Sequence, residues 1–191
     1  KSEYRKTLST RVQSYLKNLQ TRTFKPSSIN RLDQNTSGLV IFCKTYDALK
    51  NYNELMRNRE IKKYYLCIVH GMVDKHGEIK GYLTKDPKKN VVDIKEKNYN
   101  GKGQFIHTKY KPLDYYGKFT LLEVEILTGR AHQIRASLSK ISHPIIGDTK
   151  YGGKKIGNIT TQVLHAYKLV IGDRVFVKES DEIKRIINEL S

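Results

Sequence analysis

The sequence predicts an α+β protein whose helices flank a bent, mostly antiparallel mixed sheet. Three observations lead to this fold class. Strand-like apolar runs outnumber helical ones, the helices are inserted between them, and no β-α-β alternation repeats along the chain. At 191 residues the chain can bury a substantial core, as one domain or as one domain with two lobes.

The first third of the chain alternates helical and extended segments. Residues 7–19 place apolar side chains on one helical face with arginines and lysines opposite, which predicts a helix. The apolar run Leu39–Cys43 predicts a short buried strand, and 61–69 a longer one closed by Gly71. Between them, 46–56 predicts a helix whose inward side chains are Tyr46, Leu49, Tyr52, Leu55 and Met56.

The rest of the chain is predicted to consist mainly of paired strands. In 118–127, leucine, valine and isoleucine alternate with two glutamates, the pattern of a half-buried antiparallel strand. A terminal helix is expected at 181–190, with Ser180 as its N-cap. Residues 85–89 form a charged turn and 98–104 a polar loop. The strands are expected at 77–83, 91–95, 105–113, 118–127, 162–171 and 174–177.

Charge is the most informative bulk property. Thirty-six Lys and Arg against nineteen Asp and Glu leave a net charge of +17, far more than solubility requires. A polyanion, first of all nucleic acid, is the natural partner, although a generally lysine-rich surface would give the same number. No basic amphipathic helix favours a membrane surface, and no apolar run is long enough to span a bilayer.

Cysteine and histidine usage points to neither disulfides nor metal. Cys43 and Cys67 lie singly in apolar runs, where small buried side chains are expected, so we expect a cytoplasmic protein. The six histidines and two cysteines lack zinc-ligand spacing, and no phosphate-binding loop or hydrolase serine motif is complete. The sequence therefore implies no metal and no cofactor.

Two segments carry residues suited to chemistry. The first, Asn30–Gly38, reads Asn-Arg-Leu-Asp-Gln-Asn-Thr-Ser-Gly and is rich in turn formers. A carboxylate on such a loop, fixed by the following apolar run, can be a reactive group, although an aspartate that caps its own turn would look the same. The second segment begins with Thr-Gly-Arg-Ala-His-Gln-Ile-Arg at 128–135, where a helix starts that we expect to end near Ser142. It continues as His-Pro-Ile-Ile-Gly-Asp-Thr-Lys-Tyr-Gly-Gly at 143–153.

Together with the strand that starts at 61, these segments resemble the RluA family of pseudouridine synthases. The family motifs are His-Arg-Leu-Asp-x-x-Thr-Ser-Gly, Lys-x-Tyr-Leu, and Thr-Gly-Arg-x-His-Gln-Ile-Arg followed by Pro-Ile-x-Gly-Asp-x-x-Tyr-Gly. All three occur in order, with one departure, because Asn30 stands where histidine is usual. The resemblance implies the bent antiparallel sheet of this family, with the active site in a central cleft.

The resemblance also implies a set of site residues. Asp33 would be the catalytic carboxylate, acting as nucleophile at the anomeric carbon or as base on a sugar proton. Arg135 would pair with Asp33 and keep it ionised. Tyr65 would stack under the target uracil, while Tyr64 should point to the other face of the strand. His132 is expected to be structural rather than a proton-transfer group.

Further residues are candidates for contact with RNA. Arg31 matches the arginine that fills the space of the flipped nucleotide, and a plain phosphate contact explains it equally well. Leu66 and Ile134 are candidates for the apolar wall of the pocket. Thr36 and Arg130, which lie in the two motifs, complete the set.

The predicted function is therefore cofactor-free pseudouridine formation in RNA, most of all in large-subunit ribosomal RNA. The alternatives are a transfer-RNA substrate, a ribosome- or RNA-binding module that has lost catalysis, and a basic DNA-binding domain, for which no motif is seen. Family members usually carry an earlier strand with Lys-Pro-x-Gly and often an S4-type RNA-binding domain. We expect 1–191 to be the catalytic domain of a longer protein, and a monomer.

Overall fold

The computed structural model describes residues 7–86, 91–98 and 101–190, which divide into two compact units. The first unit comprises Lys1–Leu32 and Val40–Ile61, and the second comprises Asp33–Leu39 and Lys62–Ser191. The chain therefore passes from the first unit to the second and back before its long final run. No helix among the described residues is long and apolar enough to cross a membrane.

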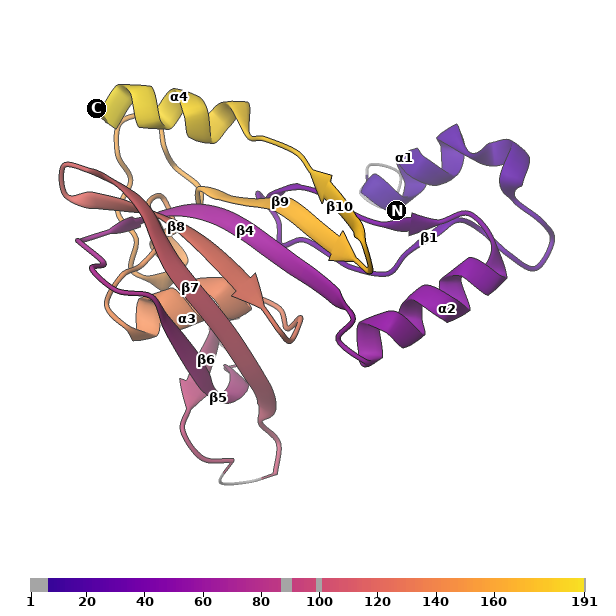
Figure 1. Cartoon of the computed structure of the whole chain (residues 1–191), viewed down its shortest axis with the longest axis horizontal. Helices are drawn as coiled ribbons and strands as arrows, with labels where there is room; N and C mark the ends of the chain where they lie inside the picture. The colour runs from indigo at the N-terminus through magenta and orange to yellow at the C-terminus, as the bar shows by residue number, and fades with distance from the viewer. Residues whose placement is uncertain (1–6, 87–90, 99–100, 191) are drawn as a thin grey trace. The chain divides into compact units, whose positions relative to one another are not determined.

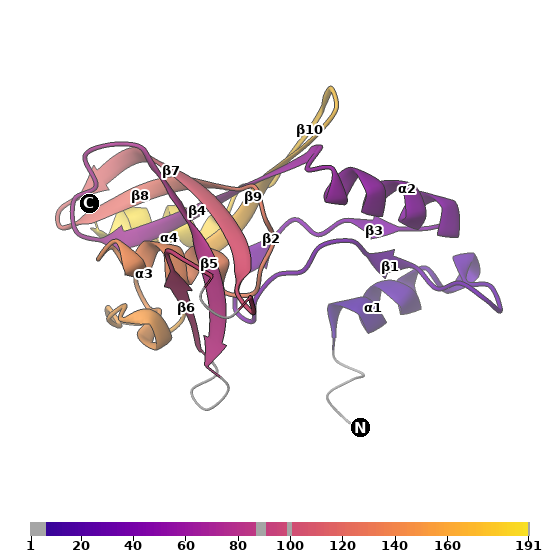
Figure 2. The ribbon, with the colours of Figure 1, turned by 90° about the horizontal axis from the view of Figure 1, so that it is seen from below.

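The first unit is a two-stranded ribbon with a helix on either side (Figure 2). Its strands β1 (Ser27–Ser28) and β3 (Phe42–Cys43) pair antiparallel. Both helices begin at a threonine whose hydroxyl accepts a backbone N–H of the first turn, 3.2 Å away in each case. These helices are α1 (Leu8–Tyr15), which a 3-10 turn at Lys17–Leu19 follows, and α2 (Tyr46–Arg57).

Two expectations for the first unit are wrong. The run Leu39–Cys43 is not one strand: only its last two residues form β3, and the N–H of Ile41 donates to the side chain of Asn30 over 2.8 Å. The N–H of Leu39 donates to the carbonyl of Ala166 in β9 over 2.9 Å, and the carbonyl of Ile41 accepts the N–H of Ile29 over 3.2 Å, but residues 39–41 are not assigned to a strand. Tyr46 is 63% exposed rather than inward, because it opens α2 and its ring meets Phe24 edge-on.

The second unit is built on an eight-stranded sheet within the described residues (Figure 1). Seven strands follow the order β10-β9-β4-β8-β7-β5-β6, and the short β2 (Ser37–Gly38) joins β9 in parallel. The pairs β10–β9, β4–β8, β5–β6, β5–β7 and β7–β8 are antiparallel. The long strands are β4 (Ile61–His70), β5 (Gly77–Asp86), β6 (Val91–Lys95), β7 (Gln104–Tyr116), β8 (Phe119–Ile126), β9 (Leu164–Ile171) and β10 (Arg174–Val177).

The face of the sheet that carries Leu122 and Val124 of β8, both fully buried, holds a large part of the core. Glu123 and Glu125 alternate with them and lie on the other face. The helix α3 (Gln133–Lys140) covers the buried face, where Ser137 hydrogen-bonds Thr108 of β7 over 3.1 Å. Ala136 of α3 belongs to a core cluster with Leu83, Ile94, Ile106 and Tyr151.

The end of the chain follows the sequence prediction closely. The β9–β10 hairpin extends from the sheet, as Figure 2 shows. The helix α4 (Asp181–Leu190) begins at Ser180, whose hydroxyl accepts the N–H of Ile183 over 3.2 Å. The mixed α+β class with a mostly antiparallel sheet is thus confirmed. Parts of the predicted turn at 85–89 and loop at 98–104 lie outside the described residues.

Candidate active site

The loop that carries Asp33 is held in a tight turn. The carbonyl of Asp33 accepts the N–H of Thr36 over 3.0 Å, and Asn35 adopts a left-handed conformation with φ of 66°. Asparagine tolerates that conformation better than most residues. The turn leaves the Asp33 side chain 15% exposed.

Beyond the turn, Gly38 lets the chain pair with β9. A Cβ at this position would lie 2.3 Å from the carbonyl oxygen of Ala166, so only glycine permits this approach. Next to it, the hydroxyl of Ser37 meets Nδ1 of the buried His165 at 2.7 Å. The loop is therefore fastened to β9 directly after Asp33.

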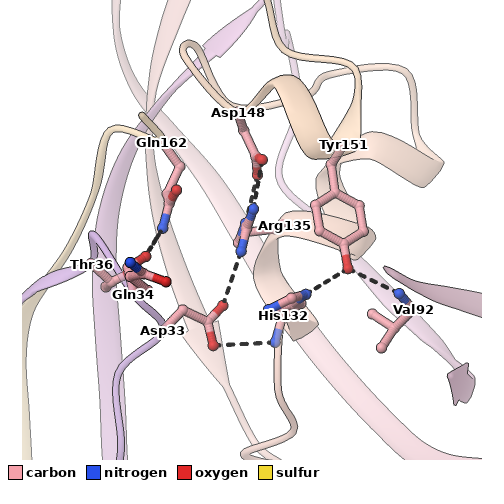
Figure 3. Close-up of polar contacts among 9 residues, drawn as sticks. All are labelled: Asp33, Gln34, Thr36, Val92, His132, Arg135, Asp148, Tyr151 and Gln162. Carbon is pink, nitrogen blue, oxygen red and sulfur yellow. Dashed lines mark hydrogen bonds and ion pairs between the residues drawn. The ribbon is translucent and has the colours of Figure 1, made fainter. Parts of the chain in front are cut away.

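A second fastening comes from Gln162, which precedes β9 and is 6% exposed. Its Nε2 donates to the carbonyl of Gln34 over 2.5 Å and to Oγ1 of Thr36 over 3.4 Å (Figure 3). Gln162 thus holds the two residues that flank Asn35 within the turn. In Figure 3 the buried Gln162 contacts the loop through Gln34 and Thr36, and not through the Asp33 carboxylate.

The carboxylate of Asp33 lies at the N-terminus of α3. The backbone N–H of His132, the N-cap residue, points to Oδ1 of Asp33 at 3.4 Å. His132 adopts a left-handed conformation, with φ of 57°, as it presents this group. A helix N-terminus favours negative charge, so the start of α3 is a suitable place for a carboxylate.

Arg135 lies between two carboxylates. Its Nη1 is 3.7 Å from Oδ2 of Asp33, while Nε and Nη2 each donate to Asp148 over 2.7 Å (Figure 3). Arg135 is 7% exposed and Asp148 2%. Burial alone would lower the pKa of Arg135, but the hydrogen bonds and charge of Asp148, with that of Asp33, raise it above its usual value. The guanidinium therefore stays charged.

Tyr151 adds a wall to this arrangement. The guanidinium carbon of Arg135 lies 4.9 Å from the centre of the Tyr151 ring, a cation–π contact. The Tyr151 hydroxyl accepts the N–H of Val92 over 3.0 Å and hydrogen-bonds Nδ1 of His132 over 2.8 Å. Burial lowers the pKa of His132, so its imidazole is mainly neutral near pH 7. His132 and Tyr151 thus brace Arg135 and the start of α3.

Tyr65 of β4 is buried, with 6% of its surface exposed. Burial, with the negative charge of Asp33, raises the pKa of the Tyr65 phenol to about 12. Its neighbour Tyr64 pairs with Glu125 on the other face, where Nζ of Lys168 lies 4.1 Å from the centre of the Tyr64 ring. The electrostatic influence of Asp33 on Tyr65, and not on Tyr64, agrees with the expected orientation of the two rings.

The structure thus brings Asp33, Tyr65 and Arg135 together in the second unit. Ile134 is buried beside Arg135, and Thr36 lies in the Asp33 loop. Leu66 is placed differently from our expectation: it alternates with Tyr65 along β4 and pairs with Glu123 on the opposite face, so it cannot line the same pocket.

The two arginines proposed for RNA contact are exposed. Arg130 lies before α3, where its backbone N–H donates to Oε1 of Gln133 over 3.1 Å, and its side chain faces solvent. Arg31 is an exposed residue of the first unit. Both are therefore accessible to a polyanion.

Sequence reasoning assigned no role to Asp148, Tyr151 or Gln162. Asp148 and Tyr151 belong to the second motif, and their presence there was the signal that could have drawn attention to them. Gln162 lies outside every motif, so nothing in the sequence singles it out. Arg135 binds Asp148 through two hydrogen bonds, whereas the contact of Arg135 with Asp33 is a longer ion pair.

This arrangement can support acid–base or nucleophilic chemistry by one carboxylate. It offers an ionised Asp33, a fixed cation, a backbone N–H and a protonated phenol in a partly dry site. Among the described residues, no group of three or more His, Cys, Asp or Glu side chains is placed to hold a metal ion.

Comparison with known proteins identifies the family. Residues 3–140 match the family model described as RNA pseudouridylate synthase. An uncharacterised RNA pseudouridine synthase of Mycoplasma genitalium is 35% identical over 153 residues, which are 77% of this chain and 47% of the relative. The ribosomal large subunit pseudouridine synthase C of Buchnera aphidicola is 38% identical over 149 residues, 72% of this chain and 46% of the relative.

A solved structure shares the fold. The human RNA pseudouridylate synthase domain containing 4 superposes with a TM-score of 0.74 at 20% identity, over 93% of this chain and 80% of that one. The chain spans about half the length of the two relatives named above. The match over most of its residues nevertheless decides its descent: the chain belongs to the RNA pseudouridylate synthase family.

Proposed function

We propose that this chain is the catalytic part of an RNA pseudouridine synthase whose substrate is large-subunit ribosomal RNA, in the cytoplasm. The observation that carries the proposal is the placement of Asp33 between the N-terminus of α3 and Arg135. The charge of Asp33 also acts on Tyr65 of β4. The net charge of +17 supports a nucleic-acid partner. The named relative that modifies the large ribosomal subunit supports the choice of RNA.

The reaction is an isomerisation, so atoms and electrons balance within the nucleoside. The bond between ribose C1′ and uracil N1 breaks, and a bond between C1′ and C5 forms. C5 gives up its hydrogen and N1 gains a proton. Asp33 would attack C1′ or remove a sugar proton, and either role requires the ionised carboxylate that Arg135 and the His132 N–H stabilise.

Tyr65 would act as a neutral group. With a phenol pKa of about 12, its hydroxyl stays protonated at neutral pH, so it serves as a hydrogen-bond donor and not as a phenolate base. Its ring offers a flat surface to a flipped uracil, and this needs no particular charge state. Tyr65 would therefore hold the detached uracil while the base turns.

The proposal can be tested directly on RNA labelled with tritium at C5 of uridine, because the reaction releases that hydrogen. We expect release from large-subunit ribosomal RNA and loss of release in Asp33→Asn, whose amide is neither base nor nucleophile. Asp173→Asn, an exposed turn position, is the matched control and should retain parental activity. An Asp33→Asn protein with more than a few per cent of parental turnover would contradict the assignment.

The choice of RNA is tested in cells. Pseudouridine positions are mapped in strains with and without the protein, and in a strain that carries the Asp33→Asn variant. Loss of positions in large-subunit ribosomal RNA supports the proposal, while loss in transfer RNA alone replaces it with the alternative substrate. Unchanged positions in every RNA would favour a binding module without catalysis.

A further inference from the structure

The two carboxylates beside Arg135 are contacted unequally. Asp148 receives two parallel hydrogen bonds of 2.7 Å from Nε and Nη2, the strongest geometry available to an arginine and a carboxylate. Asp33 faces only Nη1, at 3.7 Å, beyond the usual range of a hydrogen bond. The planar fork of Arg135 is thus engaged by the carboxylate that is not in the proposed chemistry.

Asp148 is itself held firmly. Its carbonyl accepts the N–H groups of Tyr151 and Gly153 over 3.0 and 2.8 Å. A Cβ on Gly153 would lie 1.9 Å from the carbonyl oxygen of Ile145, so the chain closes around Asp148 as no other residue would allow. Because only 1% of the Asp148 side chain is exposed, water cannot take the place of Arg135 as its hydrogen-bond partner.

The charges explain what this arrangement does to Asp33. The groups Asp33, Arg135 and Asp148 carry −1, +1 and −1, so Asp148 already compensates the guanidinium. Without Asp148, the buried cation would be free to rotate and close its fork on Asp33. That would stabilise the Asp33 carboxylate in its resting state and occupy the oxygen lone pairs that the reaction needs.

We propose that Asp148 is a positioning residue for this reaction, which keeps the fork of Arg135 turned away so that Asp33 is stabilised by charge but left free to react. The inference rests on the proposed function. It gives a defined role to the aspartate of the second motif, which acts on Asp33 only through Arg135.

Within residues 7–86, 91–98 and 101–190, the titratable groups around Asp33 come from α3 with its N-cap, from β4 and from the segment after α3. On α3 and its N-cap they are Arg135 and His132, and on β4 the group is the neutral phenol of Tyr65. The segment after α3 contributes Asp148 and Tyr151, and the charge of Lys150 acts on His132.

The test compares Asp148→Asn with Glu123→Gln. Glu123 is the matched control, because it is a partly buried carboxylate that pairs with Lys168 over 3.1 Å on the other face of the sheet. We expect Asp148→Asn to lower kcat about 100-fold with KM changed less than threefold, since a misplaced catalytic contact costs about that much. Glu123→Gln should retain parental kcat. Equal kcat in parent and Asp148→Asn would overturn the proposal.

A second readout does not depend on turnover. A crystal structure of Asp148→Asn should show the fork of Arg135 closed on Asp33, with two of its nitrogens within about 3 Å of the Asp33 oxygens. A fork that stays turned away from Asp33 overturns the proposal. If the parent protein releases no tritium from RNA, the proposed function fails, yet this structure still decides the role of Asp148.

A measurement on the parent covers the case in which Asp148→Asn does not fold. The Nε proton of Arg135 is donated to Asp148 and buried, so its exchange with water should be slow enough to observe by nitrogen-15 NMR. Exchange as fast as that of a surface arginine would show that the fork is not engaged and would overturn the proposal.

Discussion

The backbone N–H of His132 points to the carboxylate of Asp33 over 3.4 Å, although the two residues are 99 positions apart. His132 presents this N–H from a left-handed conformation with φ of 57°, which most side chains disfavour. A backbone conformation that costs energy therefore presents the N–H that contacts the Asp33 carboxylate. Strain of this kind persists only where the surroundings enforce it.

We expect substitutions of His132 to separate the backbone from the ring. His132→Asn and His132→Val both remove the imidazole, but asparagine tolerates positive φ and valine does not. His132→Val should be less stable than His132→Asn by about 1–3 kcal/mol and should lose more activity. Chemical unfolding and tritium release measure the two effects. Equal stability of the two variants would show that the conformation of His132 carries no strain.

Gln162 should matter to catalysis although it touches no substrate. Gln162→Glu removes the donor that faces the carbonyl of Gln34 and places a carboxylate oxygen opposite that carbonyl, which should cost about 1–3 kcal/mol of stability. With the Asp33 loop loosened, we expect kcat to fall at least about tenfold. Gln20→Glu is the control, since Gln20 makes a comparable bond to a backbone carbonyl in the first unit. A Gln162→Glu protein with parental kcat would show that the contacts of Gln162 with the Asp33 loop do not affect catalysis.

The sequence predicted the elements of the sheet well because their signals are local. Alternation in β8 and the N-cap at Ser180 depend on neighbouring residues, and the structure has them where the patterns placed them. The turn between β7 and β8 lies later than expected, because Tyr115 and Tyr116 still pair with β8. The run Leu39–Cys43 failed for the opposite reason. An apolar run predicts burial but not the strand with which each residue pairs. Here Phe42 and Cys43 pair with β1, whereas the N–H of Leu39 donates to Ala166 of β9.

The site was predictable only as far as its motifs reach. Asp33, Tyr65 and Arg135 were identified by resemblance, and the structure places them together. The unequal contacts of Arg135 and the anchoring by Gln162 depend on tertiary distances, which no spacing in the sequence encodes. Leu66 shows the limit in another way, because the period of a strand would have excluded it from the face of Tyr65.

The pKa of Tyr65 predicts an alkaline loss of stability. The folded phenol has a pKa of about 12, whereas an unfolded tyrosine titrates near 10. Between these values the folded protein holds a proton that the unfolded chain releases, so stability is full below pH 10 and falls as pH rises toward 12. The loss should reach about 2–3 kcal/mol, measured by chemical unfolding across this range. Tyr65→Phe should remove this part of the pH dependence, and an identical slope in both proteins would contradict the assignment.

Arg31 is predicted to contribute to RNA binding in a way that a substitution can define. It is exposed and lies two residues before Asp33 in the sequence. If it fills the space that a flipped nucleotide leaves, Arg31→Ala should slow modification of uridines in structured RNA more than in an unstructured strand, where little unstacking is needed. Turnover of both substrates is measured for parent and variant.

The salt dependence of affinity separates this role from a simple phosphate contact. Each phosphate contact contributes to the slope of log affinity against log salt, so a phosphate role for Arg31 predicts a slope in Arg31→Ala that is shallower by about one unit, with equal loss of turnover on both RNAs. Arg22→Ala, another exposed arginine of the first unit, serves as the control for general charge. An unchanged slope with a selective loss on structured RNA would assign Arg31 to the vacated stack, because filling that space acts on the flipped state and not on the phosphate backbone.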